Sequence, residues 1–363
     1  MQIDTNKDSS TFEPLTVIGL MSGTSTDGLD IAAVHFNQVN DQIVYELVDK
    51  QFVPYTAEWT KKLIEAPHLS GRELRRLDVE FGMFLANEVL QFSHNKEWKA
   101  RLIGSHGHTV FHVPSELYTM QIGCGATLAA ISGIPVVCDF RQGDVALQGQ
   151  GAPLVPIGDQ MLFKQYAYCV NLGGFANVSN QVNGQRLAWD ICALNVVLNE
   201  LSAEAGFKYD DGGQLAQQGK VIPALLSQLE ALEYYELSAP KSLGTEWVES
   251  KVRPLLSLYQ QEPLVNRLNT YTEHAARRIA AVLQGKQSKA YFSGGGCNND
   301  YLLSLIKRVS EAEIIVADST LKDFKEALIF ALLAYLRWHG KQSTIQSVTG
   351  ASRAIPAGAI YLA

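Results

Sequence analysis

Cysteine and charge are scarce in this 363-residue chain. Charged residues make up only 18% of it, and the net charge of −7 offers no basic surface of the kind that binds nucleic acid. No C-x-x-C pair occurs, which argues against a zinc knuckle or a disulfide framework and favours a reducing compartment. The five cysteines are widely spaced, at Cys124, Cys138, Cys169, Cys192 and Cys297.

Long hydrophobic runs are missing as well. The longest, Ala327–Leu336, lies inside an expected helix over 324–339 and is too short for a bilayer span, which needs about 20 residues. Residues Met1–Pro14 are polar and acidic, without the basic start and apolar centre of a signal peptide. We therefore expect a cytoplasmic protein with no membrane partner, and the 47% hydrophobic content predicts a well-buried core.

Two familiar phosphate-binding motifs are also absent. The chain contains no G-x-x-x-x-G-K-[ST], and no G-x-G-x-x-G opens a helix after a strand. The glycine-rich segment that is present, 19–30, lies instead between two expected strands, 15–21 and 31–36. A P-loop and a dinucleotide fold are therefore unsupported.

The segment 19–30 has the composition of an anion-binding turn. Gly23 and Gly28 allow close backbone approach, and neighbouring hydroxyls stand beside exposed N–H groups. Asp27 is suited to hold a metal-bound water, as phosphoryl transfer requires. A ligand-free turn explains the same composition about equally well. The candidate nucleotide-binding residues are Gly23, Thr24, Ser25, Thr26, Asp27, Gly28, Leu29 and Asp30, with Asp27 also the candidate metal ligand.

Two further glycine turns follow expected strands. Gly173, Gly174 and Asn177 lie in a second strand–turn–strand, and Gly294, Gly295 and Gly296 precede a helix over 300–309 that Asn298 is expected to cap. Loops of this kind suit a nucleotide that is gripped from two sides. The triplet lacks side chains, so a flat adenine or ribose can lie against its backbone.

The order of elements predicts a duplicated plan. A three-stranded meander over 15–53 resembles the later one that begins near 167, and no low-complexity linker marks a boundary. We expect domains over 1–135 and 136–340, with 341–363 a C-terminal segment that helps to complete the first. A phosphate loop followed by a strand is the order seen in the actin, hexokinase and Hsp70 superfamily. The predicted fold is therefore α/β, a two-domain actin-like ATPase (ribonuclease H-like) fold with an interdomain cleft.

Histidines gather at 106–112. If the segment is one strand, His106, His108 and His112 point the same way. The H-x-H spacing also suits a metal, but the other histidines supply no evident ligand set. We favour hydrogen bonding of His106, His108 and Thr109 to substrate hydroxyls or to the backbone.

Three charged residues are further candidates. Asp190, at an expected strand end, suits a general base, but taken without any family an Asp there is better explained as the cap of the following helix. Arg141 suits an anion, phosphate or carboxylate, with a surface salt bridge as the alternative. Glu326 opens an apolar helix, where a solvated acidic residue is favoured by the helix dipole.

Ten segments together resemble the anhydro-N-acetylmuramic acid kinase family from Ile18 to the C-terminus. They are GLMSGTSTDGLD at 19–30, GSHGHTVFHVP at 104–114, QIGCGATLAAISGIPVVCDFR at 121–141, GQGAPLVPIGD at 149–159, VNLGGFANVS at 170–179, KYDDGG at 208–213, PKSLGTEW at 240–247, FSGGGCNN at 292–299, KEALIFALLAY at 325–335 and SVTGASR at 347–353.

The resemblance implies a cytoplasmic kinase of cell-wall recycling that uses ATP and Mg²⁺. It implies that water opens the 1,6-anhydro bridge of the sugar and that the released O6 is phosphorylated. The family's catalytic base stands in D-T-G-P-G-N, which corresponds here to 190–195, with Asp190 and Asn195 kept but both glycines and the proline replaced. The family's glutamate at the sugar site corresponds to Glu326. An ordinary sugar kinase of the same fold and a non-catalytic nucleotide-switched module are the alternatives, and a homodimer is left open.

Overall fold

The computed structural model describes residues 13–40 and 42–363, and the chain divides into two compact units. The first comprises the described residues up to Leu162 together with Phe324–Ala363, and the second comprises Phe163–Asp323. Most of the N-terminal segment Met1–Pro14, on which the expectation of no signal peptide was based, lies outside the described residues.

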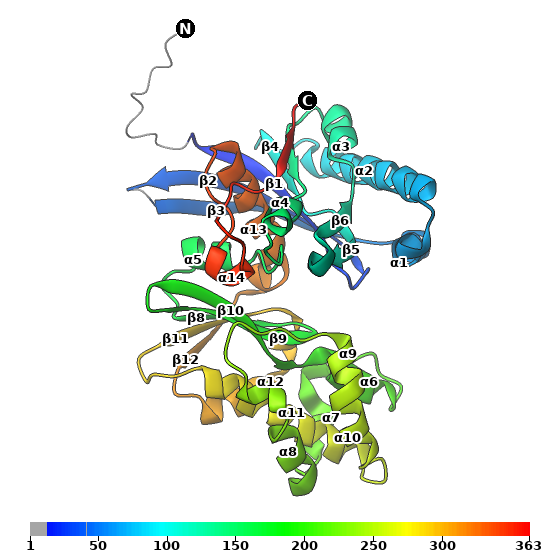
Figure 1. The fold of residues 1–363 in the computed structure, drawn as a ribbon, viewed down its shortest axis with the longest axis vertical. Helices are drawn as coiled ribbons and strands as arrows, with labels where there is room; N and C mark the ends of the chain where they lie inside the picture. Colours follow the sequence, from blue (N-terminus) through cyan, green and yellow to red (C-terminus); the bar gives the residue numbers. More distant parts are fainter. Residues whose placement is uncertain (1–12, 41) are drawn as a thin grey trace. The chain divides into compact units, whose positions relative to one another are not determined.

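The first unit is built on a six-stranded sheet (Figure 1). Three antiparallel strands form its meander, and two further strands run parallel to the first of them. A short antiparallel strand completes the other edge. In sheet order the strands are β13 (Ala359–Tyr361), β7 (Val136–Cys138), β4 (Leu102–Ser105), β1 (Leu15–Ser22), β2 (Gly28–Val39) and β3 (Gln42–Pro54).

Helices and a hairpin surround this sheet. A capping box between Ser70 and Glu73 starts the longest of the early helices. The hairpin pairs β5 (His108–Val113) with β6 (Tyr118–Ile122). The helices are α1 (Ala57–Glu65), α2 (Gly71–Ser93), α3 (Gly125–Ser132), α4 (Gln142–Ala146), α5 (Pro156–Leu162), α13 (Ser319–Trp338) and α14 (Gln346–Thr349), with 3-10 turns at Ala66–His68 and Pro114–Glu116.

Two glycines explain how α13 reaches this sheet. A Cβ at Gly19, on β1, would overlap the carbonyl of Ala327, and one at Gly104, on β4, would overlap that of Phe330. The helix backbone therefore lies directly on the two central strands, a close approach that only glycine permits. Residues 327–336 of α13 are buried, in line with the expected core helix. The helix begins at Ser319, however, so Glu326 lies inside it and the expectation that Glu326 opens the helix was wrong.

The second unit repeats the strand plan. Its five-stranded sheet has an antiparallel meander followed by two strands parallel to the first strand of that meander. The order is β10 (Gln185–Ala193), β9 (Phe175–Val182), β8 (Tyr168–Leu172), β11 (Lys289–Ser293) and β12 (Glu313–Val316). Both sheets thus place their third, second, first, fourth and fifth strands side by side in that order, which confirms the predicted actin-like α/β fold.

The helices of the second unit are α6 (Asn195–Ala203), α7 (Gln214–Gln218), α8 (Pro223–Glu230), α9 (Thr245–Trp247), α10 (Arg253–Ser257), α11 (Leu264–Val282) and α12 (Asp300–Val309). Shorter turns occupy Asp211–Gly213, Glu233–Glu236, Val248–Val252 and Gly295–Asn298. The N-cap of α12 is Asn299, whose side chain accepts from Leu302 N–H at 2.9 Å, so the expected cap at Asn298 was wrong by one residue.

The observed division differs from the expected boundaries at 135 and 340. Strand β7 pairs with β4 in the first sheet, and α13 packs on β1 and β4. Residues 136–162 and 324–340 therefore belong with the first unit, because their partners in the sheet are there. The expectation that C-terminal residues complete the first unit agrees with this division.

Candidate functional site

In the first unit, the polar candidates lie at one edge of the sheet. Strands β1, β4 and β7 are parallel, so their carboxyl ends meet at the same edge. The segments that leave these ends hold the loop after Ser22, the histidine pair that begins at His106, and Arg141. Ligands of open α/β sheets commonly bind at this edge.

The loop between β1 and β2 is hydrogen-bonded to the chain that follows β3. Tyr55 N–H donates to the Asp27 carbonyl at 3.0 Å, and Thr60 Oγ1 donates to the Thr26 carbonyl at 3.2 Å. Ser25 Oγ donates to Asp27 Oδ1 at 2.5 Å. Thr24, Ser25 and Asp27 are exposed, so hydroxyl and carboxylate oxygens are available at the loop surface.

Two of the predicted loop residues, Leu29 and Asp30, do not lie at the surface of the loop. Leu29 is fully buried in the core of the first unit, so its side chain is not available at the loop surface. Asp30 lies within β2, opposite Met21 on β1. The predicted contacts of this loop with a nucleotide therefore depend mainly on residues 23–28.

Arg141 is anchored by His106. Its Nε and one terminal nitrogen donate to His106 Nε2 at 3.2 and 2.9 Å. The other ring nitrogen of His106, Nδ1, lies 2.9 Å from the Gly107 carbonyl and therefore carries the proton. Burial and the Arg141 charge hold the pKa of His106 well below its usual range, so the ring is neutral and Nε2 is free to accept.

A second anchor fixes the same guanidinium. The third Arg141 nitrogen donates to the Gly151 carbonyl at 2.8 Å, and Gly151 N–H donates to the buried Asp144 carboxylate at 2.8 Å. Burial lowers the pKa of Arg141 to about 10, whereas the charge of Glu326 raises it. Arg141 thus stays cationic at neutral pH, close enough to Glu326 for the two charges to interact. Arg141 is therefore a partly buried, oriented cation, and the alternative of a surface salt bridge gains no support.

His108 has a different set of partners. Its Nδ1 lies 3.1 Å from Ser22 Oγ, which also accepts from the Tyr55 hydroxyl at 2.7 Å. Thr109 Oγ1 accepts from Gln121 Nε2 at 3.3 Å. His112 does not join the other two histidines, since its Nδ1 pairs with Thr119 Oγ1 at 3.1 Å.

The metal alternative for these histidines gains no support. Both ring nitrogens of His106 are engaged by protein groups, and β5 begins only at His108, after Gly107 with a φ of +73°. His106 and His108 therefore do not lie on one strand, contrary to the expectation from the sequence. Within residues 13–40 and 42–363, no group of three or more His, Cys, Asp or Glu side chains is arranged to hold a metal ion.

In the second unit, the candidates again lie where parallel strands end. Strand β8 ends at Leu172 and β11 at Ser293, and these two strands are parallel neighbours. Asp190 faces Asn177 across the β9–β10 pair, and Asn177 faces Asn171 across the β8–β9 pair. Paired residues of adjacent strands share a face of the sheet. The predicted base and the predicted nucleotide residue Asn177 are therefore neighbours in one polar row.

The Asp190 carboxylate is positioned by the segment that contains Leu243. Leu243 N–H donates to Oδ2 at 2.9 Å, and Asp190 N–H donates to the Lys241 carbonyl at 3.1 Å. Burial raises the pKa of Asp190, and the Leu243 hydrogen bond opposes that rise. Asp190 is not the cap of α6, because that helix begins at Asn195 with Leu194 as its N-cap.

The glycines of the two turns in this unit differ in whether they leave room for a side chain. A Cβ at Gly294, whose φ is +90°, would clash with the Asn171 side chain, and one at Gly296 would lie 2.8 Å from Leu172. By contrast, a Cβ at Gly174 or Gly295 would meet nothing within 4 Å. The backbone at Gly174 and Gly295 is therefore accessible, as a nucleotide lying against these turns requires.

The carbonyls of the first of these turns are already used. Gly174 O accepts from Leu194 N–H at 2.8 Å and Val196 N–H at 3.2 Å, and Gly173 O accepts from Asn195 N–H at 3.3 Å. The carbonyls of the turn after β8 thereby accept hydrogen bonds from the N–H groups at the start of α6, which have no acceptor within the helix. The N–H groups of the turn, not its carbonyls, are what it offers to a phosphate.

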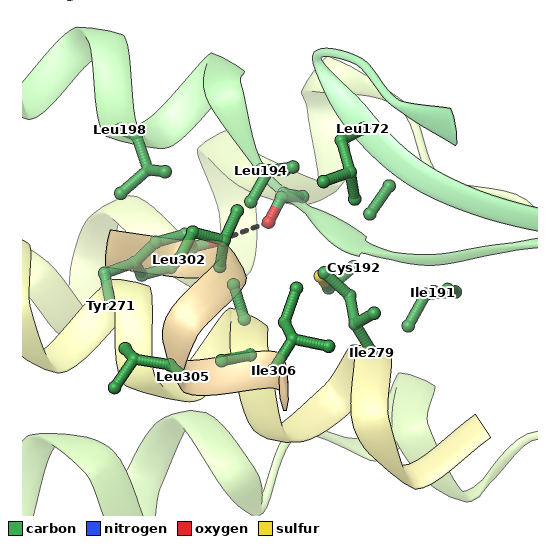
Figure 2. Packing of buried hydrophobic residues seen from close by; sticks show 14 of the residues in the cluster. Leu172, Ile191, Cys192, Leu194, Leu198, Tyr271, Ile279, Leu302, Leu305 and Ile306 are labelled. Atoms are coloured by element: carbon green, nitrogen blue, oxygen red, sulfur yellow. Dashed lines mark hydrogen bonds between the residues drawn. The ribbon is translucent and has the colours of Figure 1, made fainter. Parts of the chain in front are cut away.

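The segment that departs from the family motif is part of the core. Figure 2 shows Ile191, Cys192 and Leu194 packed among Tyr271, Ile279 and other apolar side chains. The Tyr271 hydroxyl donates to the Ala193 carbonyl at 3.0 Å. The substitutions at 191–194 therefore fill the interior of the second unit behind Asp190, and they add no polar group to the candidate site.

Sequence reasoning missed several groups that hold the candidates in place. Tyr55, Asp144 and the Leu243 backbone were not predicted. Leu243 bonds to Asp190 and Tyr55 to Ser22 beside the loop, whereas Asp144 acts on Arg141 only through Gly151. The only signal was indirect: pairing of β2 with β3 sets Gly28 opposite Pro54, and so brings Tyr55 beside the loop.

Comparison with known proteins agrees with the motifs. The model of a family described as anhydro-N-acetylmuramic acid kinase matches residues 15–363. A protein of that name from Colwellia psychrerythraea is 34% identical over 384 residues, covering 95% of this chain and 96% of its own. One from Vibrio cholerae is 33% identical over 365 residues, covering 95% of this chain and 97% of its own.

Solved structures show weaker overall likenesses. Component A of (R)-2-hydroxyglutaryl-CoA dehydratase from Acidaminococcus fermentans has a TM-score of 0.45 at 16% identity, covering 88% of this chain and 98% of its own. The activator of 2-hydroxyisocaproyl-CoA dehydratase from Clostridium difficile, solved with ADPNP, has a TM-score of 0.44 at 13% identity, covering 88% and 94%. In the described part of the chain, no helix combines the length and apolarity that a membrane crossing needs.

Proposed function

The chain belongs to the anhydro-N-acetylmuramic acid kinase family, and on that premise we propose that it phosphorylates 1,6-anhydro-N-acetylmuramate with ATP. In the proposed reaction, water adds to C1 while the C1–O6 bond of the bridge breaks. O6 takes the γ-phosphoryl group, ADP leaves, and the proton of the water passes to a base. The product is N-acetylmuramate 6-phosphate, as expected for a cytoplasmic enzyme of amino-sugar recycling.

The observation that carries this proposal is the placement of Asp190. Its carboxylate is oriented by one backbone N–H through Oδ2, it stands in a polar row with Asn177 and Asn171, and it does not cap a helix. Burial raises its pKa, which makes it a better proton acceptor than an exposed aspartate. Asp190 is therefore the proposed base that takes the proton of the attacking water.

The first unit supplies the proposed sugar contacts. Arg141, fixed by His106 and Gly151, is suited to the lactyl carboxylate of the substrate, because an oriented guanidinium binds carboxylates through parallel hydrogen bonds. His108, Thr109 and Glu326 are the further proposed contacts to hydroxyl groups. In this arrangement His106 acts through Arg141, since both of its ring nitrogens are already occupied.

The glycine loops fit a nucleotide. Gly174 and Gly295 leave open space over their backbones, and residues 23–28 present hydroxyls and an exposed carboxylate. Bound ATP would supply the phosphoryl group, and Mg²⁺ would neutralise charge on the phosphates. Asp27, beside Ser25, offers the hard oxygen donors that Mg²⁺ prefers, directly or through water. The convergence of the three loops on one interdomain cleft remains a prediction.

One assay tests the proposal. The protein is incubated with ATP, Mg²⁺ and 1,6-anhydro-N-acetylmuramate in ¹⁸O-water, and the product is analysed by mass spectrometry. We expect N-acetylmuramate 6-phosphate with one ¹⁸O at C1. Phosphorylation of N-acetylglucosamine without solvent oxygen, and no turnover of the anhydro sugar, would identify an ordinary sugar kinase instead.

A further inference from the structure

Tyr55 is the least expected residue near the candidate sugar contacts. It follows β3 and is packed against Phe81 and Phe84, with ring centroids 6.2 and 5.9 Å away. Its hydroxyl donates to Ser22 Oγ at 2.7 Å, and Ser22 Oγ lies 3.1 Å from His108 Nδ1. The three side chains form a continuous hydrogen-bonded chain that starts at a phenol and ends at an imidazole.

The direction of this chain follows from proton counting. Tyr55 is the donor in the first bond, so Ser22 Oγ uses a lone pair there. Ser22 is only 1% exposed, and a buried hydroxyl proton needs an acceptor. His108 Nδ1 is the acceptor that the structure places beside it, so Nδ1 carries no proton.

The imidazole is neutral near pH 7. Burial lowers the pKa of His108 to about 4, because no solvent compensates the charged form. A neutral ring has one N–H, and with Nδ1 accepting from Ser22 that N–H is at Nε2. The ring can then donate a single hydrogen bond through Nε2.

We propose that Tyr55 and Ser22 are positioning residues that fix His108 as its Nε2–H tautomer, so that the ring donates one hydrogen bond to an acceptor oxygen of the sugar. The proposal rests on the proposed function for the identity of that ligand. In this proposal Tyr55 and Ser22 act on the sugar only through His108. The alternative tautomer would present a lone pair at Nε2 and would select a donor instead.

Tyr55 also joins this chain to the loop after β1. Its backbone N–H holds the Asp27 carbonyl at 3.0 Å, and this contact does not involve the phenol. Tyr55→Phe therefore removes the hydroxyl while it keeps the ring packing and the loop contact. Ser22→Ala removes the central hydroxyl and leaves Tyr55 and His108 intact.

The tautomer is measured directly by long-range ¹H–¹⁵N NMR of the histidine rings of the full chain near pH 7. The His108 signals are assigned as those that disappear in His108→Gln. We expect the Nε2–H pattern in the wild type and a shift toward a mixture of tautomers in Ser22→Ala. An Nδ1–H pattern in the wild type, or an unchanged pattern in Ser22→Ala, would overturn the proposal.

Kinetics provide the second readout. Ser22→Ala should raise the KM for the anhydro sugar by about fivefold, the equivalent of one net hydrogen bond, and leave the KM for ATP unchanged. Tyr55→Phe should change the sugar KM in the same direction by a smaller factor, and Tyr259→Phe in the second unit is the matched loss of a phenol hydroxyl. Equal increases in both KM values would indicate general disturbance and would contradict the positioning role. If the wild type does not turn over the anhydro sugar, the proposed function fails, while the NMR result still decides the tautomer.

Discussion

The Arg141 guanidinium donates two hydrogen bonds to one acceptor, His106 Nε2, at 3.2 and 2.9 Å. This pairing needs a neutral imidazole with its proton on Nδ1, and the Gly107 carbonyl 2.9 Å from Nδ1 fixes that tautomer. Two residues that are 35 positions apart in the chain are thus paired. The histidine orients the guanidinium, and the charge of the guanidinium is suited to bind an anion.

Arg141→Lys tests whether the oriented guanidinium binds the substrate carboxylate. Lysine keeps the charge but loses the planar fork and the bonds to His106 and Gly151. We expect the KM for the anhydro sugar to rise by about tenfold or more, since charge-assisted hydrogen bonds contribute about 1.5–3 kcal/mol each, with the KM for ATP unchanged. Steady-state kinetics with each substrate varied in turn measure both values. Arg72→Lys, at an exposed position, is the control, and an unchanged sugar KM in Arg141→Lys would remove Arg141 from the sugar site.

Gly295→Val tests the nucleotide assignment of the glycine triplet. A Cβ at Gly295 meets nothing within 4 Å, so the variant should fold with near-normal stability. A branched side chain on a backbone that must lie against the nucleotide should weaken ATP binding by about 1–3 kcal/mol, as overpacking does. Calorimetric titration with ATP and thermal unfolding measure the two effects separately.

Gly294→Ala is the informative counterpart. Gly294 has a φ of +90°, and a Cβ there would clash with Asn171. This variant should lose stability, whatever its effect on ATP. Wild-type ATP affinity in a folded Gly295→Val protein would mean that the nucleotide does not contact the triplet.

The order of the strands could be predicted from the sequence, whereas the hydrogen bonds that position the candidate site residues could not. Apolar runs and glycine turns indicated both meanders, because strand formation is driven by local hydrophobic patterning. The bonds from Tyr55 to Ser22 and from Leu243 to Asp190 join residues 33 and 53 positions apart, and nothing local specifies them. The domain boundary was misplaced for the same reason: β7 and α13 belong to the first unit only through their long-range partners.

The cation requirement separates phosphoryl transfer from zinc hydrolysis. We expect activity to disappear when Mg²⁺ is omitted and to survive dialysis against a zinc chelator, because phosphate charge requires a hard cation. Asp27→Asn should raise the Mg²⁺ concentration needed for half-maximal activity, since it removes the exposed carboxylate beside Ser25. Stoichiometric zinc in the purified protein, lost in His106→Ala or His108→Ala, would instead revive the metal-hydrolase interpretation.

A buried histidine of the second unit should make stability depend on pH. His274 Nδ1 lies 2.6 Å from Glu230 Oε1, its Nε2 accepts from the Tyr235 hydroxyl at 2.9 Å, and Arg278 pairs with the same glutamate. Burial, assisted by the charge of Arg277, lowers the pKa of His274 to about 3. The neutral ring therefore donates to Glu230.

Folding stability should fall as the pH is lowered, because the unfolded chain binds more protons than the folded one. Between the unfolded pKa of about 6.5 and the folded value of about 3, unfolding takes up a proton at His274. This contribution to stability is fully present above about pH 6.5 and is lost as the pH falls, by about 1.4 kcal/mol per pH unit. Urea unfolding between pH 7 and 4 measures the slope. His274→Gln should flatten it and exposed His68→Gln should not, so equal slopes in all three proteins would contradict the assignment.

Asp190→Asn tests whether Asp190 is the general base. Asn keeps the size of the side chain, and its amide oxygen can still accept from Leu243 N–H, so the variant should fold. It cannot accept the proton of the attacking water, and loss of a general base typically lowers kcat by about 10²–10⁴-fold. Stopped-time assays of the anhydro sugar at saturating ATP measure kcat, and ATP titration should show unchanged affinity. Asp49→Asn on β3 provides the matched control.

The alternative role as a helix cap is already excluded by geometry, because α6 starts five positions later with Leu194 as its N-cap. A large loss of turnover in Asp190→Asn therefore cannot be attributed to α6. Because burial raises the pKa of Asp190, the wild-type kcat should fall on the acid side as that carboxylate is protonated, at a pH above the usual range for aspartate. Near-normal kcat in stable Asp190→Asn, with the same acid limb, would show that another group accepts the proton. The apolar replacement of the family's glycines at 191–194 would then mark a change of mechanism rather than of packing.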